Sequence, residues 1–255
     1  MAKLSVCIEM FWRDQTPDKK VALSGELGYK AAEFWGWQGK DIDKIKAAAD
    51  AAKMKIATFC MATAVPLVNP NAKEALKKGL EDTIPVARKL DVNRLILTTG
   101  NERTKERFEV TKSTVIRNLK SLVPILESNG IMLCIEPLNT YVNHLGYWLA
   151  CMSDAADICA EVDSPWVKIL MDIYHQQITE GNIIQTIQEY SSLIGHYHCA
   201  GVPGRHELVG GELDYRYIFK AIDDTGYDAY IGLEFSPTIG ETDALKQAKT
   251  LVKKK

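Results

Sequence analysis

Residues 131–172 read IMLCIEPLNTYVNHLGYWLACMSDAADICAEVDSPWVKILMD, and this stretch decides the fold. It begins with a short apolar run at 131–136, continues through a helical pattern at 152–162, and ends in a second run at 167–172. Both runs are largely apolar and rich in Ile, Leu, Met and Val, which is typical of strands that are buried on both faces. The stretch therefore predicts a strand–helix–strand unit of a parallel sheet.

The same alternation of strand and helix patterns extends through the whole chain. Gly28 and Gly130 each follow a helical segment, where a residue with left-handed backbone commonly ends a helix. The predicted strands are 3–9, 31–35, 54–60, 94–99, 131–136, 167–172, 194–200 and 229–235. The predicted helices are 17–28, 41–53, 72–91, 104–129, 152–162, 179–190, 214–225 and 240–253.

Eight strand–helix units in 255 residues match the size of a (β/α)₈ barrel. We therefore expect an α/β protein in which residues 1–255 form a single TIM-barrel domain, because no segment has the composition of a linker. An open doubly wound sheet is the alternative. The first predicted strand lacks the glycine-rich turn of such folds, since Met10-Phe11-Trp12-Arg13 follows it.

Composition and charge exclude several classes of protein. The chain has 31 Lys and Arg and 33 Asp and Glu, which gives a net charge of −2. It therefore lacks the excess of positive charge that is typical of nucleic-acid-binding proteins. No apolar run approaches the roughly 20 residues of a membrane span, and the first residues lack a signal-peptide pattern. The six cysteines form no C-x-x-C pair and are expected to be buried and reduced. We expect a cytoplasmic protein with neither a membrane nor a nucleic acid as partner.

Four potential metal ligands lie near the carboxyl ends of four consecutive predicted strands, and they are Glu136, Asp172, His198 and Glu234. They are 36, 26 and 36 residues apart, or one strand–helix unit each, so a parallel barrel brings them to one mouth. Each alone would be an ordinary helix cap or ion pair. Together, three carboxylates and one imidazole predict a site for Mn²⁺, Mg²⁺ or Co²⁺, with Zn²⁺ less favoured.

A divalent ion with open positions favours one kind of reaction. Two adjacent oxygens of a small hydroxy ketone can bind it, and the ion then stabilises the enediolate that forms when a neighbouring carbon loses a proton. Glu136 and Glu234 come from different strands and are the expected catalytic pair, one removing a proton and the other returning it.

Further polar and aromatic residues are expected to contact the substrate. His175 and Arg205 follow the sixth and seventh strands and are suited to a hydroxyl, carbonyl or carboxylate. An ion pair between Arg205 and Glu207 is the alternative. Trp12 and Trp35 fall in predicted loops at the same mouth, where aromatic walls would exclude water.

Glu33 lies inside an apolar strand, where a buried carboxylate needs a partner. We include it with the substrate-binding residues, and support of the site from behind or a purely structural ion pair are its alternatives. His196 shares a strand face with His198 but lies deeper, and is expected to be a core histidine.

Four motifs of the second half of the chain carry a family resemblance. They are Ile-Glu-Pro-Leu-Asn (135–139), Met-Asp-Ile-Tyr-His-Gln-Gln (171–177), Gly-His-Tyr-His-Cys-Ala-Gly-Val-Pro-Gly-Arg-His-Glu (195–207) and Gly-Leu-Glu-Phe (232–235). These motifs resemble the hydroxypyruvate isomerase family, which belongs to the xylose-isomerase-like barrels and has the ketose 3-epimerases as relatives. The resemblance implies a TIM barrel, a metal site at the four ligands named above with its two glutamates as the proton-transfer pair, and substrate contacts from His175 and Arg205.

Two departures bear on the substrate. Val142 stands where ketose 3-epimerases typically have a second Glu, and His198 stands where hydroxypyruvate isomerases often have Gln. We expect a metal-dependent isomerase that converts hydroxypyruvate to 2-hydroxy-3-oxopropanoate through a cis-enediolate, with a ketose 3-epimerase or related sugar isomerase as the alternative. A metal phosphodiesterase acting on DNA and a non-catalytic barrel are less favoured. The aromatic loop at 137–151 suggests a homo-oligomer.

Overall fold

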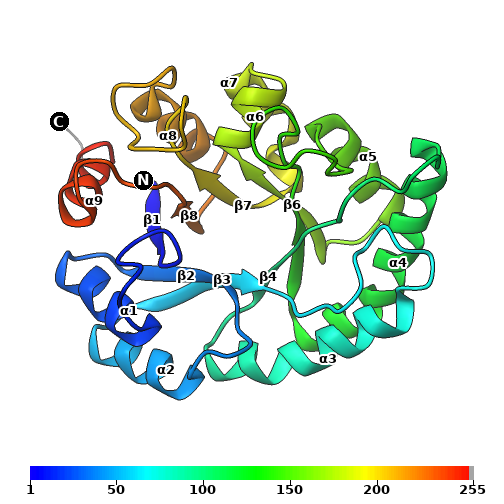
Figure 1. Cartoon of the computed structure of the whole chain (residues 1–255), viewed down its shortest axis with the longest axis horizontal. Coiled ribbons are helices and arrows are strands. Elements are labelled where there is room, and N and C mark those ends of the chain that lie inside the picture. The colour runs from blue at the N-terminus through cyan, green and yellow to red at the C-terminus, as the bar shows by residue number, and fades with distance from the viewer. Residues whose placement is uncertain (253–255) are drawn as a thin grey trace.

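Within residues 1–252, eight parallel strands pair in chain order, and the first pairs with the eighth to close a barrel. The computed structural model describes residues 1–252, and Figure 1 shows its strands as an inner ring surrounded by helices. The predicted (β/α)₈ barrel is confirmed, and the open doubly wound sheet is wrong because no strand is left at an edge. The strands are β1 (Lys3–Cys7), β2 (Ala31–Gly36), β3 (Lys55–Cys60), β4 (Arg94–Leu97), β5 (Met132–Ile135), β6 (Val167–Asp172), β7 (Ile194–Cys199) and β8 (Tyr230–Leu233).

The helices follow the predicted order with three differences. The helix expected at 104–129 begins only at Phe108, and the one expected at 179–190 begins only at Ile183, after Gly181 and Asn182, which both have left-handed backbone. A further short helix at Ile173–Thr179, directly after the sixth strand, was not predicted. The helices are α1 (Pro17–Glu26), α2 (Ile42–Ala51), α3 (Lys73–Lys89), α4 (Phe108–Asn129), α5 (Met152–Val162), α6 (Ile173–Thr179), α7 (Ile183–Tyr190), α8 (Tyr215–Asp224) and α9 (Glu241–Thr250), with a 3₁₀ turn η1 (Ser191–Leu193).

The two glycines expected to end helices do so. Gly28 lies just beyond the end of α1 with a φ of 79°, and Gly130 caps α4 with a φ of 63°. Both angles lie in the left-handed region, which glycine enters without a steric penalty. The chain reverses at these points towards β2 and β5.

The barrel has two kinds of interior. The main hydrophobic core lies between the strands and the surrounding helices. A separate small cluster of Ile96, Cys134 and Leu170 fills the barrel between β4, β5 and β6. On β1, β2 and β7 the buried side chains include polar ones instead, namely Ser5, Glu33, His196 and His198. The polar half of the interior lies directly beneath the site described below.

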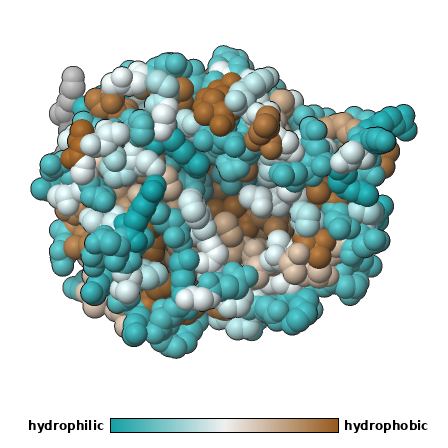
Figure 2. All heavy atoms as spheres, in the orientation of Figure 1, coloured by the Kyte–Doolittle hydropathy of each residue, from teal (hydrophilic) through white to brown (hydrophobic). Residues whose placement is uncertain are grey.

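The surface and the cysteines agree with a globular barrel. The face in Figure 2 is mostly hydrophilic and is hollowed near its centre, where apolar residues are visible. Within residues 1–252 no helix is both long and apolar enough to cross a membrane. All six cysteines are free, and four of them are buried.

Gly79 lies where α3 packs closely against the segment that follows β3. A β-carbon added there would lie 2.0 Å from the carbonyl oxygen of Ala62, which is backbone and cannot rotate away. We expect Gly79→Ala to lower the free energy of unfolding by roughly 1–3 kcal/mol, the usual effect of overpacking, as measured by urea denaturation. Glu81→Ala, at an exposed position on the same helix, is the control. Equal urea midpoints for the two variants would contradict the expected clash.

Candidate active site

A cavity of about 260 Å³ opens at the carboxyl ends of the strands. It is smaller than the roughly 300–1,000 Å³ of pockets that bind drug-sized ligands, so it suits a small metabolite. Two larger hollows, of about 460 and 720 Å³, are lined by none of the four predicted metal ligands. The residues that line the cavity are Trp35, Cys60, Ile96, Thr98, Glu136, Leu138, His144, His175, His198, Arg205 and Glu234.

The structure brings the four predicted metal ligands together. Glu136, Asp172, His198 and Glu234 are all buried, and each offers a ligand atom within 4.8 Å of the others. The strand register explains the meeting, because Asp172 on β6 lies beside His198 on β7, and Glu136 and Glu234 follow the ends of β5 and β8. These four residues lie at the carboxyl ends of the parallel strands, and the active sites of TIM-barrel enzymes lie at that end of the barrel.

Asp172 is held by the helix that it starts. Its Oδ1 accepts hydrogen bonds from the backbone N–H groups of Tyr174 (2.8 Å) and His175 (3.2 Å), so it is the N-cap of α6. This cap fixes the rotation of the carboxylate. The other oxygen, Oδ2, is left to face the cluster.

His198 lies at the centre of the buried charges. Its Nδ1 is 3.1 Å from Oε2 of Glu234 and 3.6 Å from Oε1 of Glu136, while its Nε2 is 2.8 Å from Oε1 of Glu33. Burial by itself lowers the pKa of His198, but the carboxylates of Glu234 and Glu33 outweigh it and raise the pKa well above the usual value. Without a metal ion, the imidazole is therefore held in its charged form.

Arg205 points into the cluster rather than along its own loop. Its Nη2 donates a hydrogen bond to Oε2 of Glu234 (2.6 Å) and lies 3.5 Å from Oδ2 of Asp172. The carboxylate of Glu207 instead accepts hydrogen bonds from the backbone of Thr238 and Ile239, so the alternative ion pair of Arg205 with Glu207 is wrong. The guanidinium brings a positive charge to the cavity wall.

The two glutamates that face the cavity differ in acidity. Burial raises the pKa of Glu136 to about 7. Burial also opposes the ionisation of Glu234, but His198 and Arg205 outweigh it and hold the pKa of Glu234 far below its usual value. Two carboxyl groups whose pKa values are pushed apart are suited to opposite roles in proton transfer.

His175 is buried in the cavity wall. Burial lowers its pKa to about 4, so the ring is neutral at neutral pH. Its Nδ1 accepts a hydrogen bond from the backbone N–H of Asn139 (3.2 Å), which leaves the proton on Nε2. That Nε2 is 3.6 Å from Oδ2 of Asp172. The ring therefore presents an N–H donor beside the cluster.

The other predicted substrate contacts divide into those that line the cavity and those that do not. Trp35 lines it, is 45% exposed, and donates from Nε1 to Oε1 of Glu234 (2.6 Å). Trp12 and Glu33 are not among the lining residues. The Trp12 ring lies beside Phe11, with 6.0 Å between ring centroids, and Glu33 lies beneath His198.

His144 is a cavity residue that the sequence patterns did not identify. It lies in the long segment between β5 and α5, and its ring centroid is 5.1 Å from that of His175. The strand-end pattern places only residues that follow a strand closely, and His144 has no such register. No sequence motif around His144 indicated that it would reach the cavity.

The four clustered residues fit a divalent metal ion. Three carboxylates and an imidazole form an oxygen-rich donor set of the kind that Mn²⁺ or Mg²⁺ prefers. The buried Nδ1 of His198 makes no well-aligned hydrogen bond within residues 1–252, so its lone pair is available to an ion once the nitrogen loses its proton. A bound cation would also balance the negative charge that Arg205 alone cannot offset.

Metal binding should weaken as the pH falls. A cation must displace the protons that Glu136, with a pKa near 7, and His198, with its raised pKa, hold in the metal-free protein. Both groups lose protons more readily at higher pH, so we expect the affinity for Mn²⁺ to rise between pH 6 and pH 8. Titration calorimetry in buffers of different ionisation enthalpy should detect on the order of one or two protons released per ion. An affinity independent of pH would contradict this assignment of the ligands.

Comparison with known proteins gives a family match and relatives that are named as isomerases. Residues 21–254 match the family described as xylose isomerase-like TIM barrel. The chain is 37% identical over 177 residues to a Drosophila melanogaster protein provisionally named hydroxypyruvate isomerase, covering 69% of this chain and 66% of that one. It is 30% identical over 186 residues to 2-oxo-tetronate isomerase of Pectobacterium atrosepticum, covering 73% and 71%.

Solved structures share the fold at lower identity. A Brucella melitensis protein described as AP endonuclease, family 2, has a TM-score of 0.93 at 23% identity, covering 98% of this chain and 99% of that one. D-psicose 3-epimerase from Clostridium cellulolyticum, solved with D-tagatose, has a TM-score of 0.78 at 18% identity, covering 99% and 97%. At these identities the likeness is one of fold.

Proposed function

Because the chain belongs to the xylose isomerase-like TIM-barrel family and is an isomerase, we propose that it interconverts hydroxypyruvate and 2-hydroxy-3-oxopropanoate with the help of a divalent metal ion. One observation carries the proposal. Glu136 and Glu234 reach the same small cavity from β5 and β8 with pKa values shifted in opposite directions, and both belong to the metal-type cluster.

The names of the relatives favour a short hydroxy-keto acid as substrate. Hydroxypyruvate and 2-oxo-tetronate both have a ketone at C2 and a hydroxyl group at C3, so both can isomerise through an enediolate across these carbons. A cavity of about 260 Å³ suits an acid of three or four carbons. Drosophila and Pectobacterium relatives align over about two thirds or more of their own lengths.

The predicted site residues that meet at the cavity have distinct roles in this reaction. Four residues would hold a divalent ion that would supply Lewis-acid polarisation of the ketone, namely Glu136, Asp172, His198 and Glu234. One glutamate of the pair removes the proton from C3, and the other delivers a proton to C2 on the opposite side of the enediolate. The hydroxyl proton passes from the oxygen on C3 to the oxygen on C2, which completes the exchange of the hydroxyl and carbonyl groups.

The remaining residues bind and orient the acid. The Nε2–H group of His175 can donate a hydrogen bond to the carbonyl oxygen, and the guanidinium of Arg205 can bind the carboxylate. Trp35 covers the mouth of the cavity and limits access of water to the enediolate.

Proton NMR in D₂O with the Mg²⁺-loaded protein tests the proposal. We expect deuterium at C3 of hydroxypyruvate together with the aldehyde of the product. Exchange at C3 of a ketose with formation of its epimer, and none on hydroxypyruvate, would replace the proposal with the epimerase alternative. No exchange on hydroxypyruvate, 2-oxo-tetronate or a ketose panel with metal bound would overturn it in favour of a non-catalytic barrel.

Neither the epimerase nor the phosphodiesterase alternative gains support from the site. Val142, at the position where epimerases have a second Glu, is 67% exposed and does not line the cavity. The four-residue cluster contains one histidine, fewer than a multi-zinc nuclease site requires, and the likeness to the Brucella protein is one of fold.

We also propose that the chain forms a homo-oligomer in a reducing compartment. Three residues of the loop at 137–151, Tyr141, Val142 and Leu145, are exposed and apolar, and a second copy of the chain would bury them. Light scattering after gel filtration should give more than one chain per particle, and Leu145→Glu should lower that number.

A further inference from the structure

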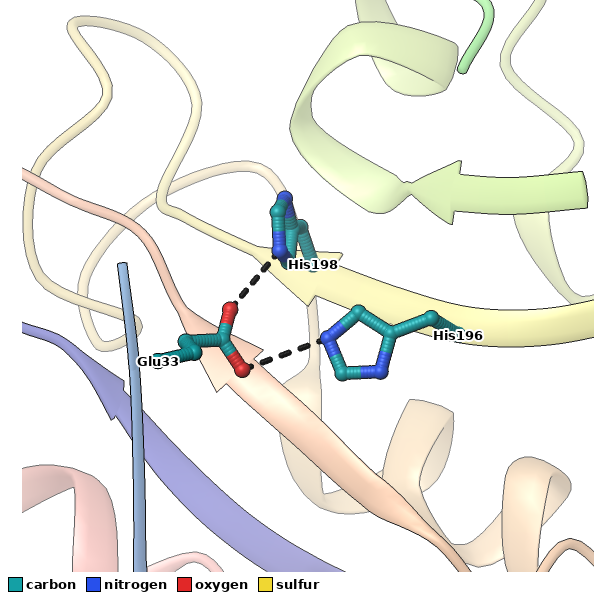
Figure 3. A group of neighbouring side chains, drawn as sticks. All are labelled: Glu33, His196 and His198. Atoms are coloured by element: carbon teal, nitrogen blue, oxygen red, sulfur yellow. Dashed lines mark hydrogen bonds and ion pairs between the residues drawn. The ribbon is translucent and has the colours of Figure 1, made fainter. Parts of the chain in front are cut away.

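Behind His198, on the side away from the cavity, lies a buried group of polar side chains that the proposed reaction does not use. Figure 3 shows the carboxylate of Glu33, from β2, with one oxygen facing the ring of His196 and the other facing the ring of His198, both on β7. Ser5 of β1 also contacts this carboxylate. All four residues are at most 2% exposed, so bulk water does not satisfy their polar atoms.

The contacts of Glu33 fix where the protons lie. Oε2 accepts hydrogen bonds from the hydroxyl of Ser5 and from Nε2 of His196 (3.2 Å), and Oε1 is 2.8 Å from Nε2 of His198. An ionised carboxylate only accepts hydrogen bonds, so the nitrogen that faces it holds a proton. The proton of a neutral His198 is therefore on Nε2, and the lone pair is on Nδ1.

Gly232 on β8 provides the space for this arrangement. A β-carbon added there would lie 2.1 Å from Oε1 of Glu33 and 2.6 Å from Cδ2 of His198. Gly232 pairs with His198 in the sheet, so its backbone is fixed beside that ring. Any side chain at position 232 would push Glu33 away from His198.

We propose that Glu33 is a positioning residue that holds His198 with Nε2 protonated and Nδ1 directed at the metal cluster, and that Ser5, His196 and Gly232 keep Glu33 in place. This inference rests on the metal-dependent function proposed above. Carboxylates that bind the far nitrogen of a metal-ligating histidine fix its tautomer and ring orientation, and their loss typically weakens metal binding about 10- to 100-fold.

Glu33, His196 and His198 also offer three ligand atoms within 4.8 Å of one another, which would suit a second metal ion. The contacts favour an ion pair of Glu33 with His198 and a hydrogen bond with His196 instead. The polar atoms already meet directly at 2.8 and 3.2 Å, and Ser5 occupies a further position on the carboxylate. The two possibilities differ in the number of ions bound per chain.

Titration of the full-length protein with Mn²⁺ tests the proposal. We expect one ion per chain for the wild type and for Glu33→Gln, with a Kd about 10- to 100-fold weaker in the variant. Two ions in the wild type and one in Glu33→Gln would overturn the proposal in favour of a second metal site. Equal Kd values would show that Glu33 has no positioning role, with the proposed function intact. No binding to the wild type would refute the proposed function and the inference that rests on it.

Two glycine variants separate positioning from general stability. Gly232→Ala should displace Glu33 and weaken Mn²⁺ binding in the same way as Glu33→Gln. Gly195→Ala is the matched control, because a β-carbon there would meet Cys134 and Met132 of β5 and not Glu33. We expect Gly195→Ala to lower the melting temperature and leave the Kd for Mn²⁺ unchanged. Equal weakening of the Kd in both alanine variants would overturn the role of Gly232.

Imidazole NMR gives a readout that does not depend on affinity. In the Mg²⁺-loaded wild type, long-range ¹H–¹⁵N spectra should show His198 protonated at Nε2, with that proton protected from exchange with solvent. In Glu33→Gln the protection should be lost or the other tautomer should appear. An unchanged His198 signal in that variant would contradict the proposal.

Discussion

Replacing either Glu136 or Glu234 with glutamine should lower kcat on hydroxypyruvate by roughly 10²- to 10⁴-fold, the usual contribution of a general acid or base. Glutamine has the size of glutamate and retains one oxygen that can ligate a metal, but it cannot accept a proton. Both side chains face the cavity, and only 3.1 and 3.6 Å separate their oxygens from the same nitrogen of His198. Each variant should also lose deuterium exchange at C3.

The measurement must separate proton transfer from metal binding, because both glutamates are also expected ligands. Rates are therefore compared at saturating Mn²⁺, with the bound metal measured in the same samples. Glu127→Gln, on the exposed face of α4, is the control and should keep the wild-type rate. Near wild-type kcat in a metal-loaded Glu136 or Glu234 variant would show that the proton-transfer assignment is wrong.

Removal of the metal should abolish turnover, and restoring it should return both activity and stability. Treatment with EDTA leaves three carboxylates around one cavity with only Arg205 and His198 to offset them. An ion that binds only the folded protein adds about 2.7 kcal/mol at 100 times its Kd, which corresponds to a rise in melting temperature of roughly 5–10 °C. Full activity of a protein shown to be metal-free by mass spectrometry would refute the metal-dependent reaction.

The pattern of apolar runs was enough to predict the barrel, because each strand is buried on both faces and therefore differs clearly from the amphipathic helices. The boundaries that failed depend on local backbone. The segment before α4 includes Lys105 with a positive φ, and α6 begins directly at β6 because Asp172 caps it. Composition does not report such backbone angles.

The residues of the candidate site likewise include some that the sequence pattern could predict and some that it could not. Residues that follow a strand by a fixed offset, such as Asp172 and Glu234, were predictable because the register of a parallel barrel places them. His144 was not, since its position depends on the path of a long loop. The role of Glu33 needed the structure as well, because a strand pattern does not show which polar atoms meet across the barrel.

Because residue 232 is a glycine and Glu33 fills the space beside it, we expect the two positions to change together in evolution. Gly232 and Glu33 lie on strands far apart in the sequence, yet any side chain at position 232 would displace the carboxylate of Glu33. A lineage that keeps the reaction must therefore keep both, whereas one that abandons it is free to change either residue first. Across related barrels, the loss of this glycine should accompany the loss of the carboxylate on β2, so the pair can distinguish working catalysts from descendants that retain only the fold.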